Sequence, residues 1–344
     1  MKRLMKFIMA VTVVLIAGAC HRLPHFENDP EGNFDALWSI LDTHYCYFRE
    51  KGIDWDSVYS VYRPKVTPET GAIELFTICS AMLDELRDGH VNLSTPFATS
   101  YYKKWWSDYP QNYDARLVEQ YYLNFGGFSR NGLTYAILPD SVGYMRYTSF
   151  SYTLSDLTLD YALALLNPCK GLIIDVRDNG GGELTNVETL VARFIDRRIT
   201  AGYISHKSGP GHGDFSEPYE YYFDPAPAPR IHWEKPVAIL TNRSTFSAAN
   251  NFVAVMHALS AVRLIGDTTG GGSGMPFSSE IPCGWSVRFS GSPVYESNML
   301  VTEFGIAPDI HVDLDPEKAL DGIDTMLDAA VDDILQRASG QKQD

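Results

Sequence analysis

The stretch "KPVAILTNRSTFSAANNFVAVMHALSAVRLIGDTTGGGSG", residues 235–274, decides the fold. Its residues 237–241 are β-branched and apolar, which is typical of a buried strand. A polar turn, a helix with one apolar face and a second strand at 262–265 follow in order. Strand, helix and strand within so few residues form a βαβ unit, and such a unit predicts a parallel sheet.

Ser247 stands where this helix begins. Free backbone N–H groups and the helix dipole favour an oxyanion at such a position. Serine is also a preferred N-cap, and a serine at this position, taken alone, is more often a purely structural cap.

A second strand–turn–helix unit at 171–196 carries the turn "DNGGG". Both turns are expected at the carboxyl edge of one sheet, where ligands bind. Residues 180–182 are glycines, which allow backbone N–H groups to point at one spot. Because no G-K-[ST] follows, the turn favours an oxyanion hole over a phosphate site, with a structural turn as the alternative.

A serine nucleophile needs a base within reach and a group that orients the base. The G-x-S-x-G motif of the α/β-hydrolases is absent around Ser247. His90 follows an Asp-Gly turn and is the candidate base, although a loop histidine taken alone is more often a surface residue than a base. His257 lies too far along the following helix to reach back.

The chain is expected to form an α/β core over residues 132–340, with a mainly parallel sheet. Three amphipathic stretches over 33–95 predict a small all-α domain, preceded by a tether at 21–32. Residues 96–131 are rich in Tyr and Trp and are interpreted as a linker with aromatic core anchors, or alternatively as a stacking surface for a peptide. The Gly- and Pro-rich residues 203–235 predict a long surface loop.

Residues 1–20 resemble a bacterial lipoprotein signal: a basic head and a short apolar run end in "AGAC". The run is too short to span a bilayer. We therefore expect Cys20 to be lipidated and to become the mature N-terminus, with an ordinary secretory peptide as the alternative. His21 is not an acidic retention signal, so the outer membrane is the expected location.

The chain carries 28 basic and 43 acidic residues, a formal net charge of −15. Removal of the signal takes away three basic residues and no acidic ones, which leaves −18. This charge argues against nucleic acid and against direct adhesion to anionic lipid, so the lipid anchor is the expected membrane contact. The remaining cysteines show no metal-ligand spacing, so no metal is expected.

Five motifs carry a resemblance to a known family: "LRDGHVNL", "KGLIIDVRDNGGGEL", "NRSTFSAANNFVAVM", "LIGDTTGGGSG" and "EFGIAPDIHV". They occur in the order found in the C-terminal-processing, or tail-specific, serine peptidases, and they look most like the branch that includes the tricorn core peptidase. The resemblance covers roughly residues 33–315. It implies a crotonase-like (ClpP/crotonase) α/β core with an added helical N-terminal part.

By this resemblance, Ser247 is the nucleophile. Ala248 supplies one N–H of the oxyanion hole and Gly181 supplies the other, with Gly182 beside it. The tail-processing branch takes its base from a lysine, but Gly272 stands at the equivalent place. The resemblance therefore excludes a Ser–Lys dyad.

The tricorn-like branch instead uses a histidine, which implies that His90 is the base and that Glu303 orients it. Gly89 departs from that branch, which has a serine before the histidine. Many members carry a PDZ domain, for which residues 96–131 are too few.

The sequence thus predicts a serine endopeptidase or carboxy-terminal-processing peptidase that acts on peptides or unfolded protein segments in the cell envelope, without a metal or organic cofactor. Two alternatives stay open. One is a peptide-binding lipoprotein that keeps the fold without the reaction, and the other is an esterase or amidase.

Overall fold

A computed structural model describes residues 25–340. The expected signal and Cys20 lie outside these residues. The described chain forms a seven-stranded sheet that is parallel from β4 to β13 and closed by two antiparallel strands at the other edge. Its strands, in spatial order, are β13 (Ile310–His311), β9 (Val262–Gly266), β8 (Val237–Thr241), β5 (Leu172–Asp175), β4 (Val142–Tyr147), β3 (Leu133–Leu138) and β2 (Phe128–Arg130). The expected α/β class with a mostly parallel sheet is confirmed.

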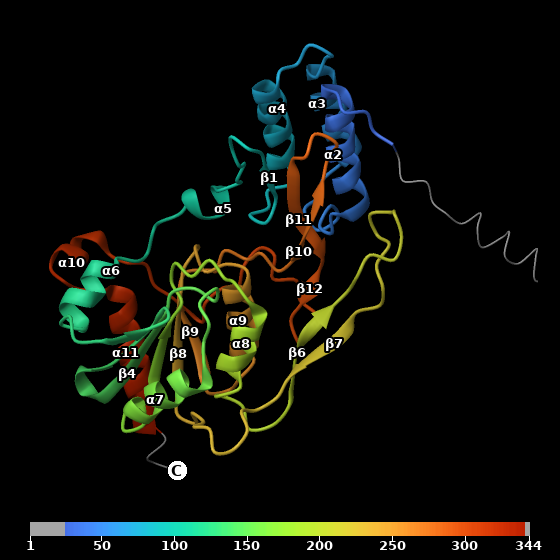
Figure 1. Ribbon diagram of the computed structural model, residues 1–344. Helices are drawn as coiled ribbons and strands as arrows, with labels where there is room; N and C mark the ends of the chain where they lie inside the picture. The colour runs from blue at the N-terminus through green and yellow to red at the C-terminus, as the bar shows by residue number, and fades with distance from the viewer. Residues whose placement is uncertain (1–24, 341–344) are drawn as a thin grey trace, which may run out of the picture.

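Helices cover both faces of this sheet (Figure 1). On β5, Ile174 packs with Phe252 of α9 in one core, whereas Ile173 packs with Met326 of α11 in another. This alternation fits the near-continuous apolar strands of a sheet that is buried on both sides. The core helices are α7 (Asp156–Leu166), α8 (Leu184–Val191), α9 (Ala248–His257), α10 (Pro316–Leu320) and α11 (Thr325–Gly340).

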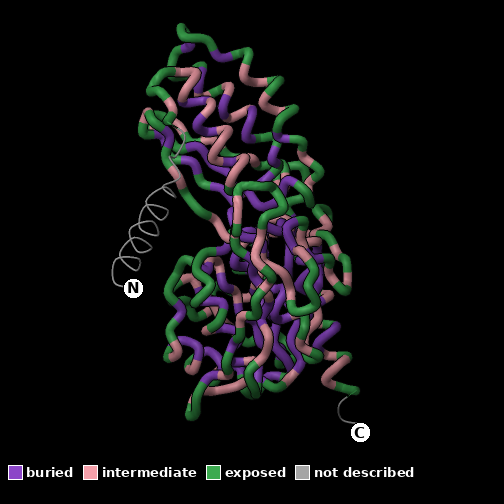
Figure 2. The backbone as a smooth tube through the Cα atoms, turned by 90° about the vertical axis from the view of Figure 1, so that its right-hand side faces the viewer, coloured by how far each residue is buried: buried purple, intermediate pink, exposed green. Residues whose placement is uncertain are grey.

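The N-terminal region contains the three expected helices, α2 (Pro30–His44), α3 (Trp55–Tyr62) and α4 (Ala72–Asp84). It is not purely α-helical. A three-stranded antiparallel sheet, β1 (Asn92–Ser94), β11 (Ser286–Ser292) and β10 (Met275–Glu280), packs against the helices. Figure 2 shows buried backbone running through this upper part of the molecule as well as through the α/β body. The helical region therefore completes its core with a hairpin from far downstream, which patterns within residues 33–95 do not indicate.

Residues 203–235 are also more ordered than expected. They contribute β7 (Tyr219–Phe223), which pairs with β6 (Ile199–Ile204), and β6 pairs in turn with β12 (Val294–Tyr295). The Gly- and Pro-rich segments on either side of β7 masked its aromatic, strand-forming composition. Within residues 25–340, we find no helix with the length and apolar character needed to cross a membrane.

The linker contains the short helices α5 (Lys104–Ser107) and α6 (Ala115–Leu117), followed by the turn of helix η2 (Val118–Tyr122). Its aromatic residues divide into two groups. Tyr113 lies beneath the Arg146 guanidinium, 3.9 Å from ring centroid to Cζ, whereas Tyr101 and Tyr121 are exposed. The interpretation as core anchors therefore holds for part of the segment only.

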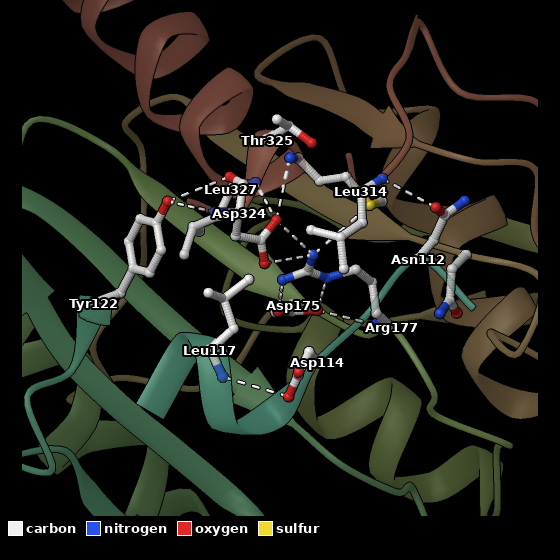
Figure 3. Close-up of polar contacts among 12 residues, drawn as sticks. Asn112, Asp114, Leu117, Tyr122, Asp175, Arg177, Leu314, Asp324, Thr325 and Leu327 are labelled. Carbon is white, nitrogen blue, oxygen red and sulfur yellow. Dashed lines mark hydrogen bonds and ion pairs between the residues drawn. The ribbon is translucent and has the colours of Figure 1, made fainter. Parts of the chain in front are cut away.

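A fully buried ion-pair cluster lies below the carboxyl edge of the sheet (Figure 3). The Arg177 guanidinium donates to Asp175 at the end of β5 (2.7 Å) and to Asp324 just before α11 (2.9 Å). The backbone N–H of Asp324 donates to the hydroxyl of Tyr122 in η2. The cluster thus connects the linker and the C-terminal helix to the end of β5, where the glycine-rich turn begins.

Candidate active site

Ser247 begins α9 with a left-handed backbone, φ 57° and ψ −121°. For a residue other than glycine this conformation costs about 1–3 kcal/mol and is typical of functional sites. Its backbone N–H donates to Gly271 O, and its side chain makes no N-cap hydrogen bond. The N-cap alternative is therefore not what the structure shows.

His90 lies in the turn between α4 and β1, and its Nε2 atom is 2.9 Å from the hydroxyl oxygen of Ser247. Asp88 fixes the turn, because its Oδ1 accepts the backbone N–H of His90 at 2.8 Å. The imidazole is buried, with an exposed fraction of 2%. Within the described residues, Nδ1 has no hydrogen-bond partner.

Burial lowers the pKa of His90 to about 4. The Asp88 carboxylate opposes this effect, while the positive charges of Arg288 and Lys51 add to it. A neutral imidazole, which can accept a proton, is therefore the dominant form at neutral pH.

Glu303 does not hydrogen-bond to the imidazole in this structure. One carboxylate oxygen lies 2.7 Å from the Lys51 ammonium, and the other accepts the Ser273 N–H at 3.0 Å. Lys51 also lies 3.4 Å from Asp88. Glu303 is thus linked to His90 only indirectly: it pairs with Lys51, Lys51 pairs with Asp88, and Asp88 accepts the backbone N–H of His90.

Burial and the nearby Asp88 charge raise the pKa of Glu303, while Lys51 opposes them. Burial alone would lower the pKa of Lys51, but the two carboxylates outweigh it and raise that pKa. All three groups are nearly or fully buried. The positive charge of Lys51 therefore offsets the repulsion between two buried carboxylates.

The two expected turns meet at the edge of the sheet, where Phe246 N–H donates to Asn179 O. A Cβ added at Gly181 would lie 2.8 Å from the backbone nitrogen of Ala248, so only glycine fits there. The Gly181 N–H itself donates to the Asn179 side chain at 3.0 Å. Ala248 N–H and Gly182 N–H have no recorded acceptor within residues 25–340, and both residues line the cavity beside the serine.

Gly272, the place of the lysine in the tail-processing branch, has φ +75°, and an added Cβ would lie 2.3 Å from the Phe246 ring. Gly89 is equally constrained, because a Cβ there would lie 2.6 Å from Nε1 of Trp105. Phe246 therefore occupies the space that a lysine at position 272 would need, and Trp105 occupies the space that a serine at position 89 would need.

A cavity of about 360 Å³ opens beside Ser247. It runs along the chain at residues 182–185, 272–276 and 294–296, and Arg288 also lines it. Within the described residues, no group of three or more His, Cys, Asp or Glu side chains is arranged to hold a metal ion.

Sequence reasoning missed Asp88 and Lys51. Asp88 stands in the same "RDGH" motif as the histidine, so that motif was a usable signal. Lys51 follows α2 in a loop, and no spacing pattern links it to Asp88 or Glu303.

The fold and the serine–histidine pair define the class, a serine-type peptidase, and the comparisons agree. The family model "Peptidase family S41" matches residues 141–312, half of the chain, and the "Tricorn protease C1 domain" model matches residues 26–84. The chain belongs to peptidase family S41.

Three relatives illustrate the similarity. A Parabacteroides merdae protein described as a peptidase is 45% identical, with a TM-score of 0.86 over 90% of this chain and 98% of that one. The carboxy-terminal processing protease CtpA of Bacillus subtilis is 26% identical over 214 residues, which are 59% of this chain and 44% of that protein. Mature CPAF complexed with lactacystin shares the fold, with a TM-score of 0.68 at 13% identity over 91% of this chain and 99% of that one.

Proposed function

We propose that this chain hydrolyses peptide bonds with Ser247 as the nucleophile and His90 as the general base. The observation that supports this most strongly is the 2.9 Å contact between the hydroxyl and Nε2, made by a serine whose backbone is strained and whose side chain caps nothing. Such a pair satisfies the geometric requirement for nucleophile and base.

In the proposed reaction, the Ser247 oxygen attacks the scissile carbonyl carbon as Nε2 of His90 takes its proton. The N–H groups of Ala248 and Gly182 bind the oxyanion that forms, and the structure favours Gly182 over Gly181 because the Gly181 N–H is already engaged. His90 then gives the proton to the leaving amine as the C–N bond breaks. Water then attacks the carbonyl carbon of the resulting ester while His90 takes a proton from it. His90 returns this proton to the Ser247 oxygen as the C–O bond of the ester breaks.

The substrates we propose are peptides or unfolded protein segments, cut near a carboxyl terminus. The cavity is lined by the start of strand β10 at Met275 and Pro276 and by strand β12 at 294–295, and such a lining suits an extended chain better than a compact small molecule. The name of the Bacillus relative, a carboxy-terminal processing protease, supports the same substrate class.

We also propose that the protein is exported and tethered through a lipid on Cys20 to the cell envelope, with the outer membrane as the expected site. Fractionation of cells that express the full chain tests this. Wild type should sediment with membranes and Cys20→Ala should not, and equal distribution of the two would contradict the tether.

The catalytic proposal is tested with a mixed peptide library and with Ser247→Ala and His90→Ala variants. Loss of the nucleophile should lower turnover by about 10⁶, the size seen for a serine protease triad. The thermal unfolding temperature should change little. Peptide cleavage by Ser247→Ala at the wild-type rate would refute the assignment, and binding without cleavage by wild type would indicate a peptide receptor.

A further inference from the structure

Three aromatic rings lie in contact beside the proposed catalytic pair, and two of them are stacked. Phe246, directly before Ser247, has its ring centroid 4.8 Å from that of His90. Trp105 of α5 stacks on Phe246, with centroids 4.2 Å apart and planes 24° apart. These two ring contacts therefore join three segments that are far apart in the sequence: the linker, the turn that carries the nucleophile and the turn that carries the base. Figure 1 shows α5 on the connection between β1 and α6.

The partly buried Trp105 indole lies close against two glycines. A Cβ on Gly89, the residue before His90, would lie 2.6 Å from Nε1 of the indole. A Cβ on Gly270, whose N–H donates to Thr245 O in the turn before the serine, would lie 2.3 Å from Cζ3. Glycine at both places lets the indole lie directly against the two turns.

The imidazole depends on packing because no carboxylate orients it through a hydrogen bond to Nδ1. Nδ1 of His90 has no hydrogen-bond partner within residues 25–340, and Glu303 is bound to Lys51 instead. Asp88 holds the backbone of His90 but leaves rotation about the side-chain bonds free. Besides its contact with the Ser247 hydroxyl, the ring packs against Phe246.

We infer that Trp105 is a positioning residue: through Phe246, it holds the imidazole of His90 and the hydroxyl of Ser247 in reacting geometry. The inference rests on the proposed function. Where catalysis depends on alignment, a displacement of about 1 Å costs about 10²-fold in rate. Loss of the indole should therefore lower the rate of bond formation at the serine without weakening substrate binding.

The test compares Trp105→Ala and Trp105→Phe with the control Tyr101→Ala, which removes an exposed aromatic side chain from the same linker. We expect Trp105→Ala to lower kcat by about 10- to 100-fold with KM unchanged, and to slow fluorophosphonate inactivation by a similar factor. Trp105→Phe should keep most of the activity because it can still stack on Phe246. The control should resemble wild type.

Unchanged kcat and unchanged inactivation in Trp105→Ala would overturn the inference, and so would a higher KM with normal inactivation, which would indicate substrate contact. If Trp105→Ala unfolds at a much lower temperature, Trp105→Leu replaces it, and equal activity of the Leu and Phe variants would then overturn the inference. Fluorophosphonate labelling of wild type and of Ser247→Ala is compared first, and labelling of wild type alone supports the proposed function. If wild type is not labelled, the proposed function fails before Trp105 is considered.

Discussion

Nε2 of His90 lies 2.9 Å from Oγ of Ser247, although 157 positions separate the two residues in the chain. The histidine comes from the helical N-terminal region and the serine from the edge of the α/β sheet. Their contact depends on how the two regions pack, and the β10–β11 hairpin, which directly follows residues 272–274 beside the serine, packs in the core of the helical region.

The acid side of the pH–rate profile should report the buried base. Since burial lowers the pKa of His90 to about 4, the imidazole stays neutral and able to accept a proton well below pH 6. We expect kcat/KM to fall only as the pH approaches about 4. The measurement is initial rates on one peptide between pH 3.5 and 8, over the range where the fold is intact, and a midpoint at or above about 6.5, the value of an exposed histidine, would contradict the account.

Gly181→Ala should lower kcat by about 10² to 10³, because displacement of either turn would move the N–H of Ala248 or Gly182 out of the oxyanion hole. The added Cβ would lie 2.8 Å from the backbone nitrogen of Ala248 and would displace one of the two turns. Gly180→Ala is the matched control, because nothing lies within 4 Å of a Cβ at that position. Similar kcat values for the two variants would show that the turn does not shape the site.

Lys51→Met should destabilise the protein by about 3–5 kcal/mol, because it leaves the buried Asp88 and Glu303 carboxylates without their cation. The pKa of Asp88 should then rise above its unfolded value, and that of Glu303, which is already raised, should rise further. A raised carboxyl pKa favours the protonated folded form, so the variant should lose more stability at pH 8 than at pH 5. Urea unfolding at the two pH values measures this effect.

Glu303→Gln in the Lys51→Met background is the corresponding rescue. It removes one of the two uncompensated charges and should restore part of the stability at pH 8. A double variant no more stable than Lys51→Met would mean that the three groups do not act as a charge-balanced unit.

Arg177→Gln should cost about 3–5 kcal/mol, since it leaves the buried Asp324 without its cation and Asp175 with only the longer contact to Arg146, at 3.6 Å. Arg198→Gln breaks a similar two-bond pair with Asp224, but that pair is exposed and should matter little. Denaturant unfolding of both variants gives the comparison, and equal losses would show that burial of the cluster is unimportant.

The sequence predicted the parts of the fold that local pattern determines. Apolar runs at 172–175 and 237–241 gave central strands, and the glycine-rich turn and Ser247 were placed at the same edge because parallel strands end there. The family resemblance supplied His90, whose position depends on tertiary packing.

The interactions that the sequence did not predict arise from packing between distant segments. The contacts of Lys51 with Asp88 and Glu303, and of Trp105 with Phe246, join residues with no shared periodicity. The direct contact of Glu303 with the imidazole was expected from the family pattern, but in this chain the carboxylate binds Lys51. Likewise, the hairpin that completes the helical region lies nearly 200 residues downstream of α4.

The most direct test of the central claim is fluorophosphonate labelling of the intact protein, with peptide mapping by mass spectrometry. The account predicts a single adduct on Ser247 in wild type at neutral pH, none in Ser247→Ala, and a labelling rate reduced by at least about 10²-fold in His90→Ala. An adduct elsewhere, no adduct at all, or a rate that does not depend on His90 would contradict it.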